Sequence, residues 1–173
     1  MGETGDLRSP ISPIFNLKSS ISAIAVLTLA LLIAACARYG PEQTLLDQFF
    51  SASRLRDKTA LQAFATVPFE PHVQGTVTTF TIVRVSPDEH KPLNMRESER
   101  RITEISVDDP RQPIDVSKYA GEMVSKDVTI QAPVRLPNGR TARKILNVIL
   151  QRAILKGDRD IVGRWIVTGF AVR

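Results

Sequence analysis

The chain contains few of the residues that build metal sites and disulfide bonds: one cysteine and two histidines among 173 residues. A single cysteine cannot form a disulfide bond within the chain. His72 and His90 lie eighteen positions apart and have no cysteine partner, which is too few ligands for a metal site. The phosphate loops GxxxxGK(S/T) and GxGxxG, the nucleophile elbow GxSxG and the zinc helix HExxH are absent. We therefore expect no metal and no cofactor.

Positive charge is concentrated towards the C-terminus. The chain carries 23 Lys and Arg against 18 Asp and Glu, and from Ala120 onward it has ten basic and four acidic residues. Such an excess is typical of a solvated sheet face, and it would also suit contact with anionic lipid headgroups or an anionic wall polymer. No aromatic residues alternate with these cations, so nucleic acid is not an expected partner.

A short apolar run precedes the cysteine. Residues 21–35 carry no charge. As a helix they would span about 23 Å, less than the roughly 30 Å hydrocarbon core of a bilayer. The run ends in Ile33-Ala34-Ala35-Cys36, which resembles the signal peptide and lipobox of bacterial lipoproteins, with Ile33 where that family has Leu. The resemblance implies that Cys36 is lipidated and that residues 37–173 are anchored on the extracytoplasmic side of the bacterial cell envelope.

Other fates of this segment stay open. The alternatives are an uncleaved helix that serves as a single-span anchor, cleavage after Ala37 by an ordinary signal peptidase, and a buried core helix. The residues before the run include Pro10 and Pro13, and Lys18 is the one charged residue among them that lies close to the run. The positive-inside signal is therefore weak. Residues 1–36 are thus predicted to be a signal peptide or membrane anchor.

Two helices are predicted at the start of the remaining domain. Pro41 suits a first helical position, where its missing N–H costs nothing. An apolar face at i, i+1, i+4 and i+5 follows; it consists of Leu45, Leu46, Phe49 and Phe50. Asp57 is a suitable N-cap for a second helix, which Pro68 and Pro71 would end.

The hydrophobic period then changes to two, which predicts strands. They are expected at residues 73–85, 128–136, 141–155 and 164–172. Residues 141–155 also place apolar side chains on one helical face, but the turn signal Asn138-Gly139 directly before them favours a hairpin. Pro133 lacks an N–H and favours a sheet edge or a bulge. The core candidates are Phe49, Phe50, Phe64, Val128, Ile130, Leu146, Trp165 and Ile166.

The segment at about 87–118 differs from its surroundings in charge and proline content. It contains Pro87, Pro92, Pro110 and Pro113. We interpret it as a charged insertion that is mostly an exposed or mobile loop, with one short strand at residues 101–107.

Helices followed by an antiparallel sheet predict an α+β fold. Four segments resemble nuclear transport factor 2-like (SnoaL-like) domains. Residues 49–52 and 57–61 resemble the opening helices of these domains. Residues 136–141 and 163–167 resemble their closing hairpin and their last strand. The resemblance covers about residues 41–86 and 123–173. It implies N-terminal helices packed on a curved antiparallel sheet, a cone with a pocket at its open end, preceded by the apolar helix.

Enzymes of that family often use an Asp, or an Asp–His pair, inside the cone. The candidates here are His72, His90, Asp57 and Asp127. Asp57 already has a structural role as a helix cap, and His90 lies in the charged insertion. His72 and Asp127 therefore remain as pocket candidates, although Asp127 beside Lys126 is typical of a surface ion pair. No catalytic residue is assigned.

Three functions are compatible with these patterns. The expected one is a membrane-anchored, non-catalytic lipoprotein that binds a small apolar ligand, a wall polymer or another envelope protein. A single-span scaffold subunit of a secretion or envelope assembly is the alternative, because scaffold proteins of type IV secretion systems are similar in outline. A cyclase- or isomerase-like enzyme is the third. The cone fold serves all three classes, so the fold alone does not decide between them.

Overall fold

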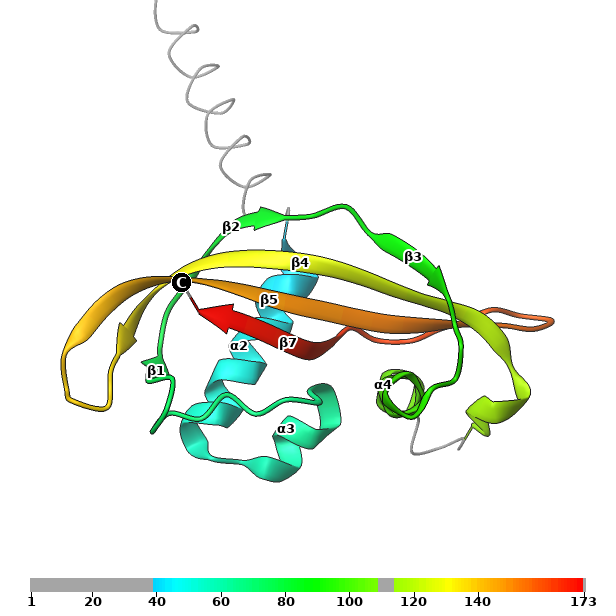
Figure 1. The fold of residues 1–173 in the computed structure, drawn as a ribbon, viewed down its shortest axis with the longest axis horizontal. Coiled ribbons are helices and arrows are strands. Elements are labelled where there is room, and N and C mark those ends of the chain that lie inside the picture. Colours follow the sequence, from blue (N-terminus) through cyan, green and yellow to red (C-terminus); the bar gives the residue numbers. More distant parts are fainter. Residues whose placement is uncertain (1–38, 109–113, 173) are drawn as a thin grey trace, which may run out of the picture. The chain divides into compact units, whose positions relative to one another are not determined.

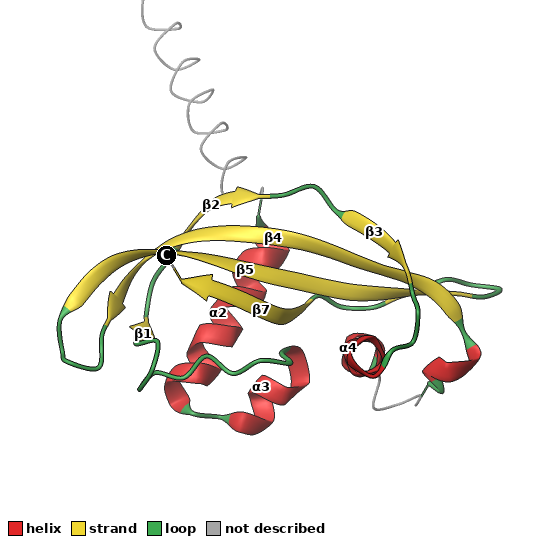
Figure 2. Ribbon diagram, in the orientation of Figure 1, coloured by secondary structure: helices red, strands yellow, loops and turns green. Residues whose placement is uncertain are grey.

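The computed structural model describes residues 39–108 and 114–172. The apolar run and Cys36 lie outside the described residues. The described part is an α+β fold, as predicted: helices pack on an antiparallel sheet of seven strands (Figures 1 and 2).

Two long strands form the centre of the sheet. β4 (Ala120–Arg135) and β5 (Thr141–Lys156) pair at every position without a register shift. The turn between them has Gly139 at φ 81°, and the Leu136 N–H donates to the Arg140 carbonyl at 2.7 Å. Gly139 suits this turn because it lacks the Cβ that disfavours positive φ. The predicted hairpin is confirmed, including the choice of strand over helix for residues 141–155.

The other strands are shorter and flank this hairpin. β1 (Thr76–Val77), β2 (Thr81–Val85) and β3 (Glu89–Pro92) pair with β4, whereas β6 (Ile161–Val162) and β7 (Ile166–Val172) pair with β5. The prediction of one strand over residues 73–85 is wrong, because residues 71–74 form a turn and the chain leaves β4 between β1 and β2. Pro133 of β4 lies opposite this break, between the pairs Val77–Val134 and Thr81–Gln131. A residue without an N–H is tolerated there because it has no neighbouring strand to donate to on that side.

Both opening helices form as predicted. α2 (Gly40–Leu55) has proline in its first turn. α3 (Lys58–Phe64) begins at Asp57, whose Oδ1 accepts from the Ala60 N–H at 2.9 Å. Such a cap satisfies one of the backbone donors that every helix start leaves unpaired.

The main core lies between α2 and one face of the long hairpin. The apolar face of α2 packs against alternate residues of β4 and β5. Phe50 of α2 contacts the rings of Phe69 and Phe80, and Phe69 also contacts Phe170 of β7. On the strands, the buried members are Val128, Ile130, Ala132, Val134, Leu146, Val148 and Leu150. The predicted core residues are buried with two exceptions: Phe64 and Trp165 are half-buried at its margin.

The charged segment at 87–118 is largely ordered into secondary structure, so its interpretation as a loop is wrong. It contains β3, the helix α4 (Glu97–Val107) and the 3-10 turn Val116–Lys118. The strand expected at residues 101–107 is part of α4. Acidic residues in its first turn favour the helix. The inward side chains recur at i, i+1, i+4 and i+5, namely Ile102, Thr103, Ser106 and Val107.

α4 packs on the other face of β5. A second core joins Val107 of α4 and Val116 to Ala153 and Leu155. These two β5 residues are odd-numbered, whereas those facing α2 are even-numbered, and successive side chains of a strand point to opposite faces. In Figure 1 α2 crosses the hairpin and α4 lies below it, nearer the end away from the β4–β5 turn. A long two-stranded ribbon twists along its length, which lets two helices pack on opposite faces at its two ends.

Gly163 permits the close approach of α4 to β5. Its N–H donates to the Ala153 carbonyl at 2.8 Å. An added Cβ would overlap Ser106 Oγ and lie 2.9 Å from the Ala153 carbonyl oxygen. Ser106 Oγ itself donates to the Arg164 carbonyl and accepts from the Ala153 N–H, so it cannot move away without loss of both bonds.

We predict that Gly163→Ala lowers the free energy of unfolding by about 1–3 kcal/mol, the usual cost of overpacking. Chemical denaturation followed by circular dichroism measures it. Gly40→Ala is the matched control, because an added Cβ there meets nothing within 4 Å. Equal unfolding midpoints for the two variants would show that the α4 junction tolerates the extra methyl group.

Candidate functional site

Two cations occupy inward positions of the central hairpin. Lys126 is in phase with the buried residues Val128 and Ile130 of β4, and Arg152 is in phase with Leu150 of β5. The register pairs Lys126 with Leu150 and Val124 with Arg152, so both cations lie on the face that carries α2. Charged side chains at such positions need partners, because burial of an isolated charge is costly.

Lys126 finds its partner at the start of α2. Its Nζ donates to Glu42 Oε1, and both side chains are at least nine-tenths buried. Each charge thus compensates the desolvation of the other. Removal of one partner from such a pair typically costs about 3–5 kcal/mol, because the remaining charge stays buried.

Trp165 lies against both cations. Lys126 Nζ is 3.9 Å and the Arg152 guanidinium carbon is 4.4 Å from the centroid of its ring. Cations over an indole face are attracted by its negative potential, by about 0.5–2 kcal/mol each. Trp165 therefore does more than fill the margin of the core: it holds two positive charges in place. We call Glu42, Asp88, Lys126, Arg152 and Trp165 the Trp165 cluster.

The Arg152 guanidinium has donors without acceptors. Its Nη2 is 3.7 Å from Asp88 Oδ2, beyond hydrogen-bond distance. Its Nε–H is buried and has no partner within the part of the chain that the structure describes. Buried polar groups without partners are uncommon, and each requires an explanation.

A hollow of about 760 Å³ opens beside the cluster. We call it the Trp165 hollow. Leu45, Phe64 and Trp165 contribute apolar wall, and Arg152 and Arg164 contribute charge. The other lining residues are Gly40, Pro41, Thr44, Gln48, Ala63 and Gly163. α2, the end of α3 and the segment before β7 therefore all border it.

Arg164 is held at the wall of this hollow by its backbone and by one hydrogen bond. Its Nη2 donates to the Ala63 carbonyl at 2.8 Å and lies 4.0 Å from Asp108 Oδ2. About half of the side chain is exposed. An exposed ion pair at that distance contributes little, about 0–1 kcal/mol, so the charge of Arg164 remains available to the hollow.

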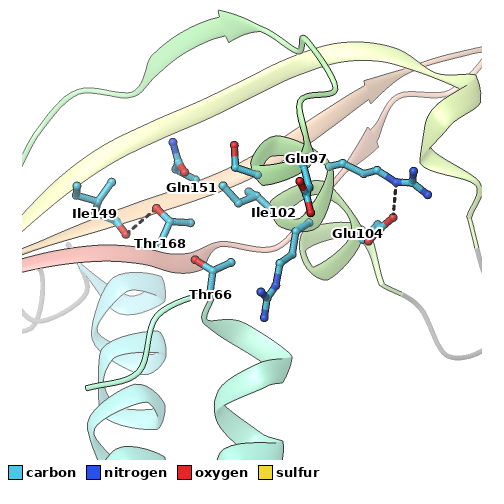
Figure 3. A pocket seen from close by; sticks show the side chains of 10 residues that line it. Thr66, Glu97, Ile102, Glu104, Ile149, Gln151 and Thr168 are labelled. Atoms are coloured by element: carbon cyan, nitrogen blue, oxygen red, sulfur yellow. Dashed lines mark hydrogen bonds and ion pairs between the residues drawn. The ribbon is translucent and has the colours of Figure 1, made fainter. Parts of the chain in front are cut away.

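A second depression of about 1030 Å³ lies between α4 and the outer face of β5 and β7 (Figure 3). Thr66, Gln151 and Thr168 line one part, and charged side chains of α4 line the other. The Arg100 Nε–Glu104 Oε1 pair, at 2.9 Å, lies along α4 itself. Its charged lining residues are of both signs, Glu97 and Glu104 with Arg100 and Arg101, whereas the charged residues that line the Trp165 hollow are both arginines. The groove therefore favours a ligand of one charge sign less than the hollow does.

The pocket candidates His72 and Asp127 are not brought together. His72 lies in the exposed turn before β1, with its Nε2 3.4 Å from Glu70 Oε2. Asp127 is exposed on β4, on the face opposite the main core, and no ion pair joins it to Lys126. Their role as pocket residues stays a prediction.

The other two candidates have partners of their own. Asp57 caps α3. His90 Nδ1 lies 2.9 Å from Glu122 Oε2, which joins β3 to β4. Within residues 39–108 and 114–172, no three His, Cys, Asp or Glu side chains are grouped as metal ligands would be. The same residues include no helix with the length and apolarity that a membrane crossing requires.

The sequence predicts Trp165 as a core residue, but it does not point to the other members of the Trp165 cluster. Arg152 enters the sequence prediction only as part of the basic C-terminal half, and Lys126 enters it there and as a surface neighbour of Asp127. One signal was present: both occupy apolar positions of alternating strands. Such a position predicts a buried charge with a partner, but it does not identify Glu42 as that partner.

Comparisons with known proteins find no match to this chain among protein-family models, curated proteins or solved structures.

We predict that Lys126→Met lowers the free energy of unfolding by about 3–5 kcal/mol, because Glu42 is left buried and unpaired. The double variant Glu42→Leu/Lys126→Met should recover most of that loss, since it leaves no buried charge. Urea denaturation of the two single variants and the double variant forms a double-mutant cycle. Additive losses in the cycle would mean that the two side chains do not act as a pair.

We predict that the stability of the fold depends on pH through the Glu122 carboxyl group. Its hydrogen bond to His90, and then the positive charge of Lys156, lower the pKa of Glu122 below its ordinary value of 4.5. A group with a lowered folded pKa stabilises the fold above its unfolded pKa and loses this contribution as the pH falls through the folded value. Glu122→Gln should therefore have a lower melting temperature than the unsubstituted chain at pH 7, and the difference should vanish below the pKa of Glu122. A difference that persists unchanged in acid would exclude the carboxylate as its source.

Proposed function

We propose that the chain is a membrane-anchored domain of the bacterial cell envelope that binds a ligand in the Trp165 hollow and does not catalyse a reaction. The proposal depends on one observation about Arg152. This residue lines the hollow, and its guanidinium donates no hydrogen bond to any residue that the structure describes. Small-molecule sites combine an apolar wall with a few polar groups that fix the ligand, and the hollow has this composition.

The surroundings of the hollow support binding rather than catalysis. Its described lining contains no carboxylate and no histidine. The nearest buried carboxylate, Glu42, is engaged by Lys126. A general base must reach the proton that it removes, and neither His72 nor Asp127 contributes to this lining.

The arrangement of helices and sheet supports the finer proposal of a nuclear transport factor 2-like cone. α2 and α3 precede the sheet, and α2 lies along the inner face of the long hairpin. β3 and α4 would then be an addition to the cone, inserted before its long hairpin.

The anchor is tested at Cys36. We expect the chain extracted from bacterial membranes to begin at a diacylated or triacylated Cys36, because Ile33-Ala34-Ala35-Cys36 follows an apolar run too short to span comfortably. Intact-mass analysis checks this. Cys36→Ser is the control and should lose the lipid mass. A mass that still includes Met1 would contradict lipidation and favour the single-span scaffold.

The same extracted sample tests the binding half of the proposal. Native mass spectrometry should show a non-covalent small molecule on the unsubstituted chain and less of it on Arg152→Gln. Arg140→Gln is the matched control. Arg140 is exposed at the distant β4–β5 turn, and its substitution removes one positive charge, as Arg152→Gln does. Equal retention by both variants would exclude Arg152 from the site.

One observation favours the alternative, a scaffold subunit. Ile145 and Ile149 are exposed by 46% and 40%, and both lie on the outer face of β5. The two lie four positions apart on one face of the strand, with Asn147 between them. Exposed apolar side chains that share a face are typical of surfaces that contact another protein. A stable oligomer in light scattering that Ile149→Asp dissociates would support this function, whereas a monomer at all concentrations would support the ligand-binding domain.

A further inference from the structure

The Trp165 hollow has an amphipathic wall. Leu45, Phe64 and Trp165 form its apolar part, and the guanidinium groups of Arg152 and Arg164 form its positive part. A ligand that matches both parts has an anionic group joined to a hydrocarbon chain.

The charges around the hollow favour an anion. Glu42 is engaged by the third nearby cation, Lys126. Arg152 and Arg164 face Asp88 and Asp108 at 3.7 and 4.0 Å, too far for hydrogen bonds. Arg152 Nε is buried and Arg164 Nη2 donates to the Ala63 carbonyl. The other guanidinium N–H groups remain for a ligand, and a planar guanidinium offers parallel donors that suit a phosphate or carboxylate.

The place of the hollow in the chain favours a membrane lipid. Gly40 and Pro41 line it, and Cys36 precedes Gly40 by four residues. An extended chain covers about 3.3–3.6 Å a residue, so this stretch reaches at most about 14 Å. An anchor at Cys36, or a span that ends at Ala35, would therefore keep the lining residues Gly40 and Pro41 close to lipid headgroups.

We propose that the Trp165 hollow binds an anionic phospholipid of the anchoring membrane. The phosphate pairs with Arg152 and Arg164, and the beginning of an acyl chain lies against Leu45, Phe64 and Trp165. The proposal rests on the membrane anchor and on binding in the hollow, and it assigns the class of ligand.

The fluorescence of Trp165 reports on the Trp165 hollow, because Trp165 is the single tryptophan of the chain. The full chain is reconstituted in phosphatidylcholine vesicles that contain a small, increasing fraction of phosphatidylglycerol brominated on its acyl chains. Bromine quenches tryptophan emission only at short range, so quenching shows an acyl chain beside the ring. A parallel series uses brominated phosphatidylcholine in place of brominated phosphatidylglycerol. It measures the contact of Trp165 with acyl chains that does not depend on the headgroup charge.

We expect half-maximal quenching at a phosphatidylglycerol fraction about tenfold lower than the phosphatidylcholine fraction, which corresponds to about 1.4 kcal/mol. Arg152→Gln should remove this preference and Arg140→Gln, with the same change in net charge, should keep it. Arg164→Gln serves as a second variant if Arg152→Gln fails to fold. Inorganic phosphate, which has no chain, should leave the emission unchanged.

Equal quenching by the two lipids, an unchanged preference in both Arg152→Gln and Arg164→Gln, or a response to inorganic phosphate alone would overturn the lipid assignment. These outcomes are separate from failure of the proposed function. A lipidated Cys36 and a retained small molecule without phosphatidylglycerol preference would overturn the ligand class alone. A chain that lacks any anchor would overturn the proposed function whatever the vesicles show.

Discussion

The unbroken pairing of β4 with β5 is the constraint on which the other elements depend. Each of the other strands that the structure describes is shorter and pairs with one of these two. The hairpin also separates the two cores, because its even-numbered residues face α2 and its odd-numbered residues face the second core at α4. A slip of one position would exchange the two faces and expose both sets of apolar side chains. The Asn138-Gly139 turn and the two-sided burial together hold the register.

The same register produces the Trp165 cluster. Lys126 and Arg152 lie on the α2 face of the hairpin. Their charges therefore meet the core near the first turn of α2, which contains Glu42. A buried ion pair of this kind adds little net stability compared with apolar residues of similar size. Its effect is on position. Lys126 is engaged by Glu42 and lies against Trp165, and the Arg152 guanidinium at the hollow faces Asp88 at 3.7 Å without a hydrogen bond.

The features that were predicted correctly depend on residues close together in the chain. Asp57 caps a helix that starts at the next residue, and Gly139 serves a turn between neighbouring strands. α4 was missed because its inward face is weakly apolar. Ser106 is buried there because it bonds to Arg164 and Ala153, 58 and 47 positions away, and such partners leave no periodic signal. The break in the strand at residues 78–80 was missed because the sequence pattern is strand-like, whereas Pro133 on the neighbouring strand offers no N–H there.

The sequence by itself determined the α+β order, the opening helices, the long hairpin and most of the core, because helix caps, turns and hydrophobic period are local properties. It also indicated which strand positions face inward. Only the tertiary structure decided which side chains from other elements contact these inward-facing positions. Glu42 is 84 positions from Lys126, and Trp165 reaches both cations only once β5 has positioned the segment before β7. Electrostatic pairing and the shape of a hollow depend on distances between elements, and periodicity along the chain contains no information about those distances.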